Sequence, residues 1–207
     1  LFVKYIPENG RSRNVIKHIA GSFFVKIGSA TVGLILVPLT ISYVDTITYG
    51  IWLTLSSIVL WISYFDIGLG NGLRNKFAEL KASESNILIR KYISTSYALF
   101  TILFLCIWLA LFIISDYISW SGILNAPLYM NMELKYTGVI ITGFFCLQMI
   151  LKIITTILTA DQKPAFASFI DFIGQFLSLL AIFALTIFST GSILYLAVAA
   201  GIMPVLV

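Results

Sequence analysis

The chain has 207 residues, of which 59% are hydrophobic and 11% are charged, and its formal net charge is +4. Ordinary soluble domains are about 45–50% apolar and about 25% charged, so this chain has too few charges to cover a surface that faces water. The composition excludes an ordinary soluble domain and favours a chain whose solvent is lipid. Two cysteines and one histidine, with no CxxC motif, favour neither a disulfide framework nor a metal site, and we expect no cofactor.

Six hydrophobic segments follow a polar N-terminal tail at residues 1–14. Each is predicted to be a helix, because lipid offers the backbone no other hydrogen-bonding partner outside a closed barrel, and the segments are too long and too continuously apolar for barrel strands. The third segment is uncharged over 24 residues and would be roughly 36 Å long as a helix, enough to cross a membrane. The six segments are Val15–Val44, Ile47–Ile67, Tyr92–Ser115, Tyr136–Ala160, Ala165–Ser189 and Ser192–Val207.

The connection between the second and third segments mixes apolar and charged residues at rough helical spacing. This pattern predicts an amphipathic helix over residues 73–93 that lies at the membrane surface, and a solvated loop is the alternative. The apolar positions are Leu73, Phe77, Leu80, Ile87 and Leu88.

Three glycines precede this connection in the sequence FDIGLGNGLRNK. Their G-x-G-x-G spacing after a membrane segment matches neither a P-loop nor a dinucleotide fingerprint, so we expect them to end the helix and let the chain turn. Asp66 and Arg74 flank the glycines at the predicted inner mouth of the bundle. A gate or coupling role is one interpretation of this pair, and an interfacial anchor and helix cap is the other.

Basic residues are distributed unevenly among the connections. If the N-terminus is cytoplasmic, ten Lys and Arg residues fall on the inner side and only Lys135 falls outside. Positive charge concentrates on the cytoplasmic side of membrane proteins, so the pattern predicts a multi-pass protein of the cell (inner) membrane with a cytoplasmic N-terminus. Tyr117, Trp120 and Tyr129 are predicted to lie in an outer aromatic belt. The ten inner residues are Lys4, Arg11, Arg13, Lys17, Arg74, Lys76, Lys81, Arg90, Lys91 and Lys163.

Three ionisable residues interrupt the apolar segments, namely Lys26, Lys152 and Asp171. A charge inside a bilayer is costly and usually faces a cavity or another charge. One interpretation is a polar cavity in which the lysines attract an anion and Asp171 is a counter-ion or a proton or cation site. The alternatives are that each lysine extends to the interface and that Asp171 is a structural, hydrogen-bonded carboxylate.

Polar residues at helical spacing extend each of these charges into a stripe on one helix face. Trp52, Ser56 and Ser63 form a similar stripe on the second segment. The stripes are His18, Ser22, Lys26 and Ser29 in the first segment, Gln148 and Lys152 in the fourth, and Ser168, Asp171, Gln175 and Ser178 in the fifth.

Three stretches have a familiar pattern: the first segment as it runs to VPLTISYV, the sequence YGIW with the later FDIGLGNGLRN, and ADQKPAFASFIDFIGQFLSLL. In these stretches the chain resembles the polysaccharide transporter (O-antigen flippase-like) family of the multidrug/oligosaccharidyl-lipid/polysaccharide flippase superfamily, over about residues 14–207. The resemblance implies an all-α, polytopic transmembrane helix bundle. Residues 15–207 would be the six-helix N-terminal lobe of a two-lobe transporter, with the C-terminal lobe outside this sequence.

The resemblance also implies a function. Such proteins flip polyprenyl-diphosphate-linked oligosaccharides across the membrane for O-antigen, capsule or exopolysaccharide synthesis, by alternating access, and they are not enzymes. Lysines in a low-dielectric cavity suit a diphosphate, and the candidates are Lys26 and Lys152. Gln148, Gln175 and Trp52 are candidates for holding the sugar. The expected partners are the lipid-linked oligosaccharide, the bilayer and a coupling H+ or Na+, with no nucleic acid.

Two other functions remain open at this point. A cation-coupled multidrug antiporter of the same superfamily predicts more acidic than basic residues in the cavity, whereas the segments hold two lysines and one aspartate. An integral membrane glycosyltransferase needs paired carboxylates or a cluster of metal ligands on a sizeable loop. The loops offer only the scattered Asp116, Glu133 and Asp161.

Overall fold

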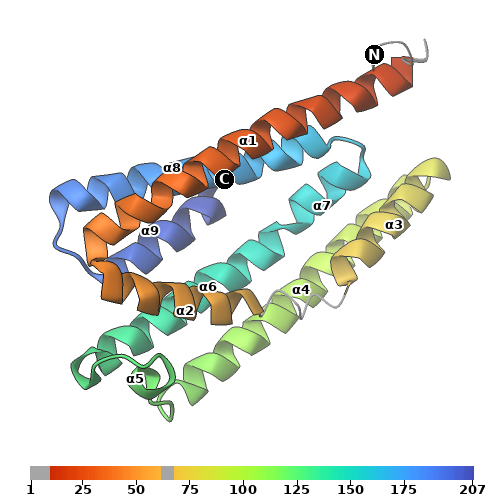
Figure 1. Cartoon of the computed structure of the whole chain (residues 1–207). Helices are drawn as coiled ribbons and strands as arrows, with labels where there is room; N and C mark the ends of the chain where they lie inside the picture. The colour runs from red at the N-terminus through yellow and green to blue at the C-terminus, as the bar shows by residue number, and fades with distance from the viewer. Residues whose placement is uncertain (1–9, 62–67) are drawn as a thin grey trace.

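The computed structural model describes residues 10–61 and 68–207, and in these residues every regular element is a helix (Figure 1). Four helical stretches are long and apolar enough to cross a membrane: Gly21–Val44, Asn86–Ile114, Leu128–Ala160 and Pro164–Phe188. Two shorter apolar helices accompany them. The predicted all-α class is confirmed, and the length and hydropathy of the helices indicate a membrane protein.

Each of the six predicted segments is mostly helical in its described residues. They correspond to α1, α2, α4, α6 followed by α7, α8 and α9, while residues 62–67 of the second segment lie outside the described residues. The elements are α1 (Gly10–Val44), α2 (Thr46–Trp61), α3 (Leu69–Ala82), α4 (Asn86–Ile114), α5 (Trp120–Ile123), η3 (Leu128–Met130), α6 (Asn131–Leu151), α7 (Ile153–Ala160), α8 (Pro164–Phe188) and α9 (Ile193–Leu206).

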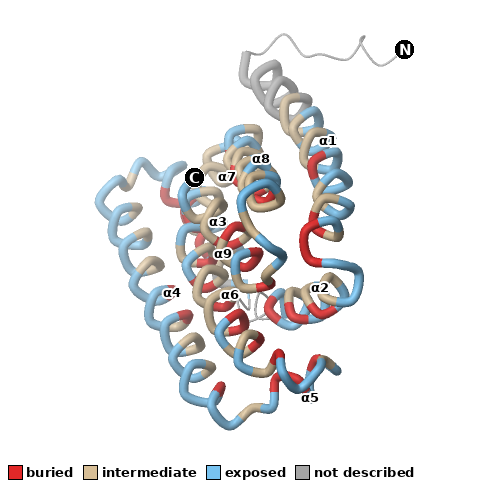
Figure 2. The backbone as a smooth tube through the Cα atoms, turned by 90° about the vertical axis from the view of Figure 1, so that its left-hand side faces the viewer, coloured by how far each residue is buried: buried red, intermediate tan, exposed pale blue. Residues whose placement is uncertain are grey.

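The bundle has two ends, which we name by their elements. The proximal end holds the start of α1, α3 and the turn between α7 and α8, and the distal end holds the α1–α2 turn, α5 and the α8–α9 turn (Figure 1). Helix α9 packs between α6 and α8 and is the most enclosed helix, whereas α4 lies at one edge and exposes most of its surface (Figure 2).

Helices α1 and α8 pack side by side and run in the same direction. A Cβ atom built on Gly21 would lie 3.4 Å from Ala165 Cβ, and one built on Gly28 would lie 3.0 Å from the Phe172 ring. Small residues allow such close approach between membrane helices. Both contacts join residues 144 positions apart, so the two helices keep a constant register along this contact.

A single residue, Asp45, joins α1 to α2. Its φ of 73° is left-handed, a conformation that Asn and Asp tolerate better than other side chains with a Cβ. Its backbone N–H donates to Ile41 O at 3.0 Å, and its carboxylate accepts from Ile47 N at 2.8 Å and from Thr48 N at 3.0 Å. Asp45 therefore ends one helix and caps the next.

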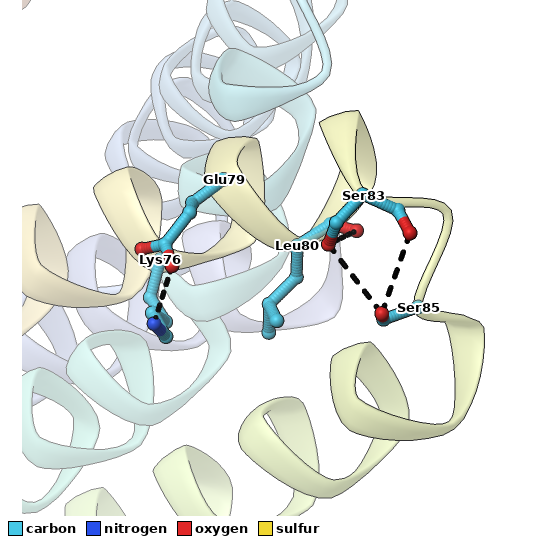
Figure 3. A network of polar contacts seen from close by, with 5 residues as sticks. All are labelled: Lys76, Glu79, Leu80, Ser83 and Ser85. Atoms are coloured by element: carbon cyan, nitrogen blue, oxygen red, sulfur yellow. Dashed lines mark hydrogen bonds and ion pairs between the residues drawn. The ribbon is translucent and has the colours of Figure 1, made fainter.

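The amphipathic segment predicted over residues 73–93 forms two elements, so its predicted end is wrong. Helix α3 begins after Gly68, whose φ of 77° makes the turn expected of the glycines, and ends at Ala82. Glu84 has a φ of 55°, and Ser83 Oγ donates to Leu80 O at 3.0 Å (Figure 3). Serine hydroxyls that bond to the backbone compete with helix continuation. The apolar spacing continues across this break, so Ile87 and Leu88 belong to α4.

The apolar face of α3 is covered by protein. Leu73, Phe77 and Leu80 are buried, and α3 packs against α4 and α7. Leu73 belongs to one apolar cluster with Phe100 and Phe104 of α4. The prediction that this face lies on lipid is therefore corrected, because α4 and α7 provide the apolar surface that it needs.

The fourth predicted segment is interrupted at Lys152, where α6 gives way to α7. The Lys152 carbonyl accepts hydrogen bonds from Thr155 Oγ1 and Thr156 Oγ1, both at 3.0 Å, in addition to the helical bond from Thr156 N. Threonine hydroxyls that bond back to a helical carbonyl often bend a helix. These bonds coincide with the break between α6 and α7 at Lys152.

Trp120 is not in an aromatic belt. It is buried at the start of α5, where its indole Nε1–H donates to Ser115 Oγ at 3.1 Å and its ring packs against Gly138. Tyr117 and Tyr129 are exposed, as a belt requires. The sequence alone does not distinguish these aromatic residues, because burial of Trp120 depends on the way the connection folds over α6.

Candidate functional site

Two of the cavities between the helices share Trp52 of α2 and Ala200 of α9 in their linings. The first, of about 200 Å³, lies among α2, α6 and α9 and is lined by Gln148. The second, of about 270 Å³, lies among α1, α2, α8 and α9 and is lined by Gln175. Three of the residues predicted to hold a sugar, on three different helices, are thus brought together around α9.

The first cavity combines aromatic walls with unused hydrogen-bonding capacity. Trp52 and Phe145 line it, and the Gln148 Nε2–H donates to Gly201 O at 3.3 Å. Ser56 also lines this cavity, and its Oγ is buried without a hydrogen-bond partner. A buried hydroxyl without a partner is costly, so this side of the cavity holds an unsatisfied polar group.

The second cavity has a row of side-chain oxygens along two of its walls. Thr40 Oγ1 donates to Leu36 O at 2.7 Å, and Ser178 Oγ donates to Gly174 O at 3.0 Å. Each hydroxyl proton is used within its own helix, so each oxygen keeps its lone pairs as acceptors. Gln175, which is exposed, adds an amide that both donates and accepts.

Asp171 and Lys152 lie one helical turn from the cavity residues, toward the proximal end. Asp171 precedes Gln175 by four residues and therefore shares its face of α8, and Lys152 follows Gln148 by four residues at the end of α6. Both charged side chains are exposed, and Lys152 acts electrostatically on Asp171. The structure thus places one carboxylate and one ammonium group near each other at the proximal side of the cavities.

Lys26 lies farther away, on the same face of α1 as the cavity lining. The spacing from Lys26 to Gly33, Val37 and Thr40 keeps one helix face, and the last two residues line the second cavity. Lys26 is exposed, and a Cβ on Gly33 would meet nothing within 4 Å. Over the 14 residues to Thr40 the helix rises about 21 Å, so Lys26 faces the approach to the cavity from the proximal end. The side chain of His18 lies outside the described residues.

The predicted gate pair is not brought to the cavities. Arg74 is exposed on α3, a helix that lines neither cavity, and Asp66 lies outside the described residues.

The distal end of the bundle is held together by polar contacts between helices. The Tyr43 hydroxyl shares a hydrogen bond of 2.7 Å with Ser189 Oγ and donates to Thr190 O at 3.3 Å. Ser192 Oγ donates to Glu133 Oε1 at 2.9 Å. An ion pair between Lys135 and Asp116 adds a link from α6 to the end of α4. These contacts close the end of the bundle that lies opposite Lys26.

Sequence reasoning missed Thr40, Tyr43 and Tyr49. Thr40 carried a usable signal, because it extends the stripe that begins at Lys26 by regular helical steps. Tyr43 carried none, because its partner Ser189 is 146 residues away in the chain. Tyr49 lines the second cavity only because the single-residue turn at Asp45 folds α2 back beside α1.

No family model, curated protein or solved structure matches this chain. The fold and the site therefore define only a class: an α-helical membrane protein with largely apolar cavities between its helices, a few polar groups in their walls and charged residues along their proximal approach.

Proposed function

We propose that this chain is the six-helix N-terminal lobe of a membrane transporter that flips polyprenyl-diphosphate-linked oligosaccharides across the cell membrane for polysaccharide biosynthesis. One observation supports this function above the others. Trp52, Gln148 and Gln175 converge on two adjoining cavities, while Lys26 and Lys152 lie toward the proximal end on the helix faces that line those cavities.

The two parts of such a substrate suit the two kinds of residue. A sugar presents hydroxyl groups and an apolar ring face, which match the amides of Gln148 and Gln175 and the Trp52 ring. A diphosphate carries negative charge, and lysines along an approach between membrane helices, where the dielectric constant is lower than in water, attract it more strongly than they do in water. We place the proximal end in the cytoplasm, because it carries the excess of Lys and Arg.

Asp171 favours one variation on this function. A carboxylate on the cavity-facing stripe of α8 suits a coupling H+ or Na+, in the flippase itself or in a cation-coupled multidrug antiporter of the same superfamily. The antiporter is the second candidate, since a cationic drug would be drawn to Asp171 and repelled by Lys152.

Transport by the reconstituted protein separates the two candidates. We expect a labelled polyprenyl-diphosphate sugar to cross the membrane of proteoliposomes that contain the protein and not that of empty liposomes. If cationic dyes cross while the lipid-linked sugar does not, the flippase proposal is wrong and the antiporter is favoured.

Substitution of the lysines tests the site. Lys26→Ala and Lys152→Ala should each lower transport by about tenfold or more, the amount expected for loss of a hydrogen bond to a charged group. Membrane abundance should stay unchanged. Lys76→Ala is the matched control, because it removes a half-exposed lysine of α3, paired with Glu79, that lines neither cavity. Normal transport by both Lys26→Ala and Lys152→Ala would exclude an anion-binding cavity.

A further inference from the structure

A cluster of opposite charges lies at the proximal end, away from the two cavities. Asp161, in the turn between α7 and α8, pairs with Lys81 of α3 and with Lys163 at 2.7 Å. The Asp161 side chain is 17% exposed, whereas those of Lys81 and Lys163 are 56% and 49% exposed. The carboxylate is therefore enclosed, and the two ammonium groups around it remain accessible.

The cluster borders a pocket of about 400 Å³ between α3 and the α7–α8 turn. Lys81 and Asp161 line it together with Gln162, and three alanines leave its walls small: Ala78, Ala82 and Ala160. Two lysines share a single carboxylate, so one positive charge beside the pocket is not neutralised. An anion with several acceptor oxygens suits this arrangement better than a neutral ligand does.

The surroundings of the pocket add to its positive charge. Residues 69–91 and 161–163 together hold six basic residues and three acidic ones. The basic residues are Arg74, Lys76, Lys81, Arg90, Lys91 and Lys163, and the acidic ones are Glu79, Glu84 and Asp161. Glu79 is already paired with Lys76 at 2.7 Å (Figure 3). The proximal face therefore presents a net positive surface around the pocket.

The level of the pocket in the membrane follows from the helices that flank it. Two stretches long enough to cross a membrane meet here, because one ends at Ala160 and the next begins at Pro164. The three residues between them thus lie just outside the apolar core, at the level of the lipid headgroups. Basic pockets between membrane helices at this depth bind anionic headgroups.

We propose that this pocket binds the phosphate of an anionic phospholipid of the surrounding bilayer, with Lys81 and Lys163 as the phosphate ligands and Asp161 as the carboxylate that neutralises one of their two charges. The inference does not depend on the transported substrate. It names a bilayer lipid because the pocket opens at the headgroup level, beside helices whose outward surfaces are apolar.

Native mass spectrometry of the full chain tests this proposal. The protein is mixed in detergent with equal amounts of phosphatidylglycerol and phosphatidylcholine that have the same acyl chains, and the bound lipids are counted. We expect the protein to retain phosphatidylglycerol in preference to phosphatidylcholine. Lys81→Gln should lower that preference about fivefold, the contribution of one basic residue near an anionic surface. Lys81→Arg keeps the charge and should keep the preference, which separates loss of the site from loss of folding.

Matched variants at the opposite end of the bundle control for charge in general. Lys135→Gln removes a lysine that is paired with Asp116 in the same manner, and it should leave the preference unchanged. Asp161→Asn frees both lysines and should raise the preference, whereas Asp116→Asn should not.

Four results would overturn the proposal. The first is a wild-type protein without preference, and the second is an equal loss in Lys81→Gln and Lys135→Gln. The third is a fall in Asp161→Asn. The fourth is complete displacement of the lipid by inorganic pyrophosphate, which would assign the pocket to a water-soluble phosphate.

Discussion

Gly191 shows how closely α1 approaches the α8–α9 turn. A Cβ atom built on Gly191 would collide with the backbone carbonyl oxygen of Tyr43. A backbone atom cannot move aside as the end of a flexible side chain can, so this position admits only glycine. The contact lies next to the hydrogen bond between Tyr43 and Ser189, and both hold the distal end together.

Replacement of this glycine should therefore destabilise the protein. We expect Gly191→Ala to lower the free energy of unfolding by about 1–3 kcal/mol, the usual cost of overpacking, and to lower Tm in detergent. Gly50→Ala in α2 is the control, because a Cβ there meets nothing within 4 Å. Alanine also favours helix over glycine, so the control should be neutral or slightly more stable. Equal Tm values for the two variants would contradict a close contact between Gly191 and the Tyr43 carbonyl oxygen.

Asp45 allows a prediction about how the stability of the folded protein depends on pH. Hydrogen bonds from the Thr48 backbone N–H, the Thr48 hydroxyl and the Ile47 N–H hold the pKa of Asp45 below its ordinary value, with the Thr48 backbone bond the largest cause. A lowered pKa in the folded state stabilises the protein above the unfolded pKa of about 3.9, and this contribution is lost as the pH falls through the folded value.

Asp45→Ala removes the cap and should cost about 1 kcal/mol near neutral pH. Measured as Tm, the difference between wild type and Asp45→Ala should shrink below about pH 4, where the carboxylate becomes protonated. Asp45→Asn keeps an acceptor oxygen and tolerates the left-handed backbone, so its stability relative to Asp45→Ala should not change with pH. A pH-dependent difference between these two variants would show that the charge of Asp45 is not the cause.

At the scale of elements, α3 is an amphipathic helix whose apolar face is covered by other helices of the same protein. Its apolar residues point toward α4 and α7, and its exposed positions include Arg74 and Glu79. A surface helix on lipid and a helix packed on other helices need the same apolar stripe, so the pattern predicts the helix and not its partner.

Cysteine labelling distinguishes the two environments of α3. In a background without Cys106 and Cys146, Leu80→Cys should react slowly with a water-soluble maleimide, because Leu80 is 5% exposed. Glu79→Cys, one residue earlier on the exposed face, should react rapidly. Rapid labelling of Leu80→Cys in a folded protein would show that α3 detaches from the bundle and has no stable contact with α4 and α7.

At the scale of the whole molecule, the two ends of the bundle are expected to face opposite sides of the membrane. The α3–α4 and α7–α8 turns lie at one end, and the α1–α2 and α8–α9 turns lie at the other (Figure 1). By the bounds of the helices, these turns contain residues 83, 162, 45 and 190 in that order. If the helices cross the membrane, single cysteines at residues 83 and 162 should be labelled from one side only. Those at residues 45 and 190 should be labelled from the opposite side.

We expect the external label to reach residues 45 and 190 in intact cells, and residues 83 and 162 only after the membrane is permeabilised. The reverse result would contradict the cytoplasmic N-terminus proposed from the basic residues. Labelling of all four positions from one side would contradict a membrane-spanning bundle.

The sequence by itself determined the helical class and the positions of six apolar helices, because lipid forces the backbone to satisfy its own hydrogen bonds. It also determined which polar residues share a helix face, as with Asp171 and Gln175, because helical periodicity is a local property. It failed at Ser83, where local hydroxyl bonds end a helix within a continuous apolar pattern.

Only the tertiary structure decided which faces meet. Trp52, Gln148 and Gln175 surround α9 because small residues let α9 fit between its neighbours: Gly174 approaches Pro204, and Gly201 lies against the Phe144 ring. Likewise, burial of Trp120 and the pairing of Lys81 with Asp161 depend on segments distant in sequence. Periodicity fixes the direction of a side chain around its own helix. The neighbour that it meets depends on how all the helices fill space together.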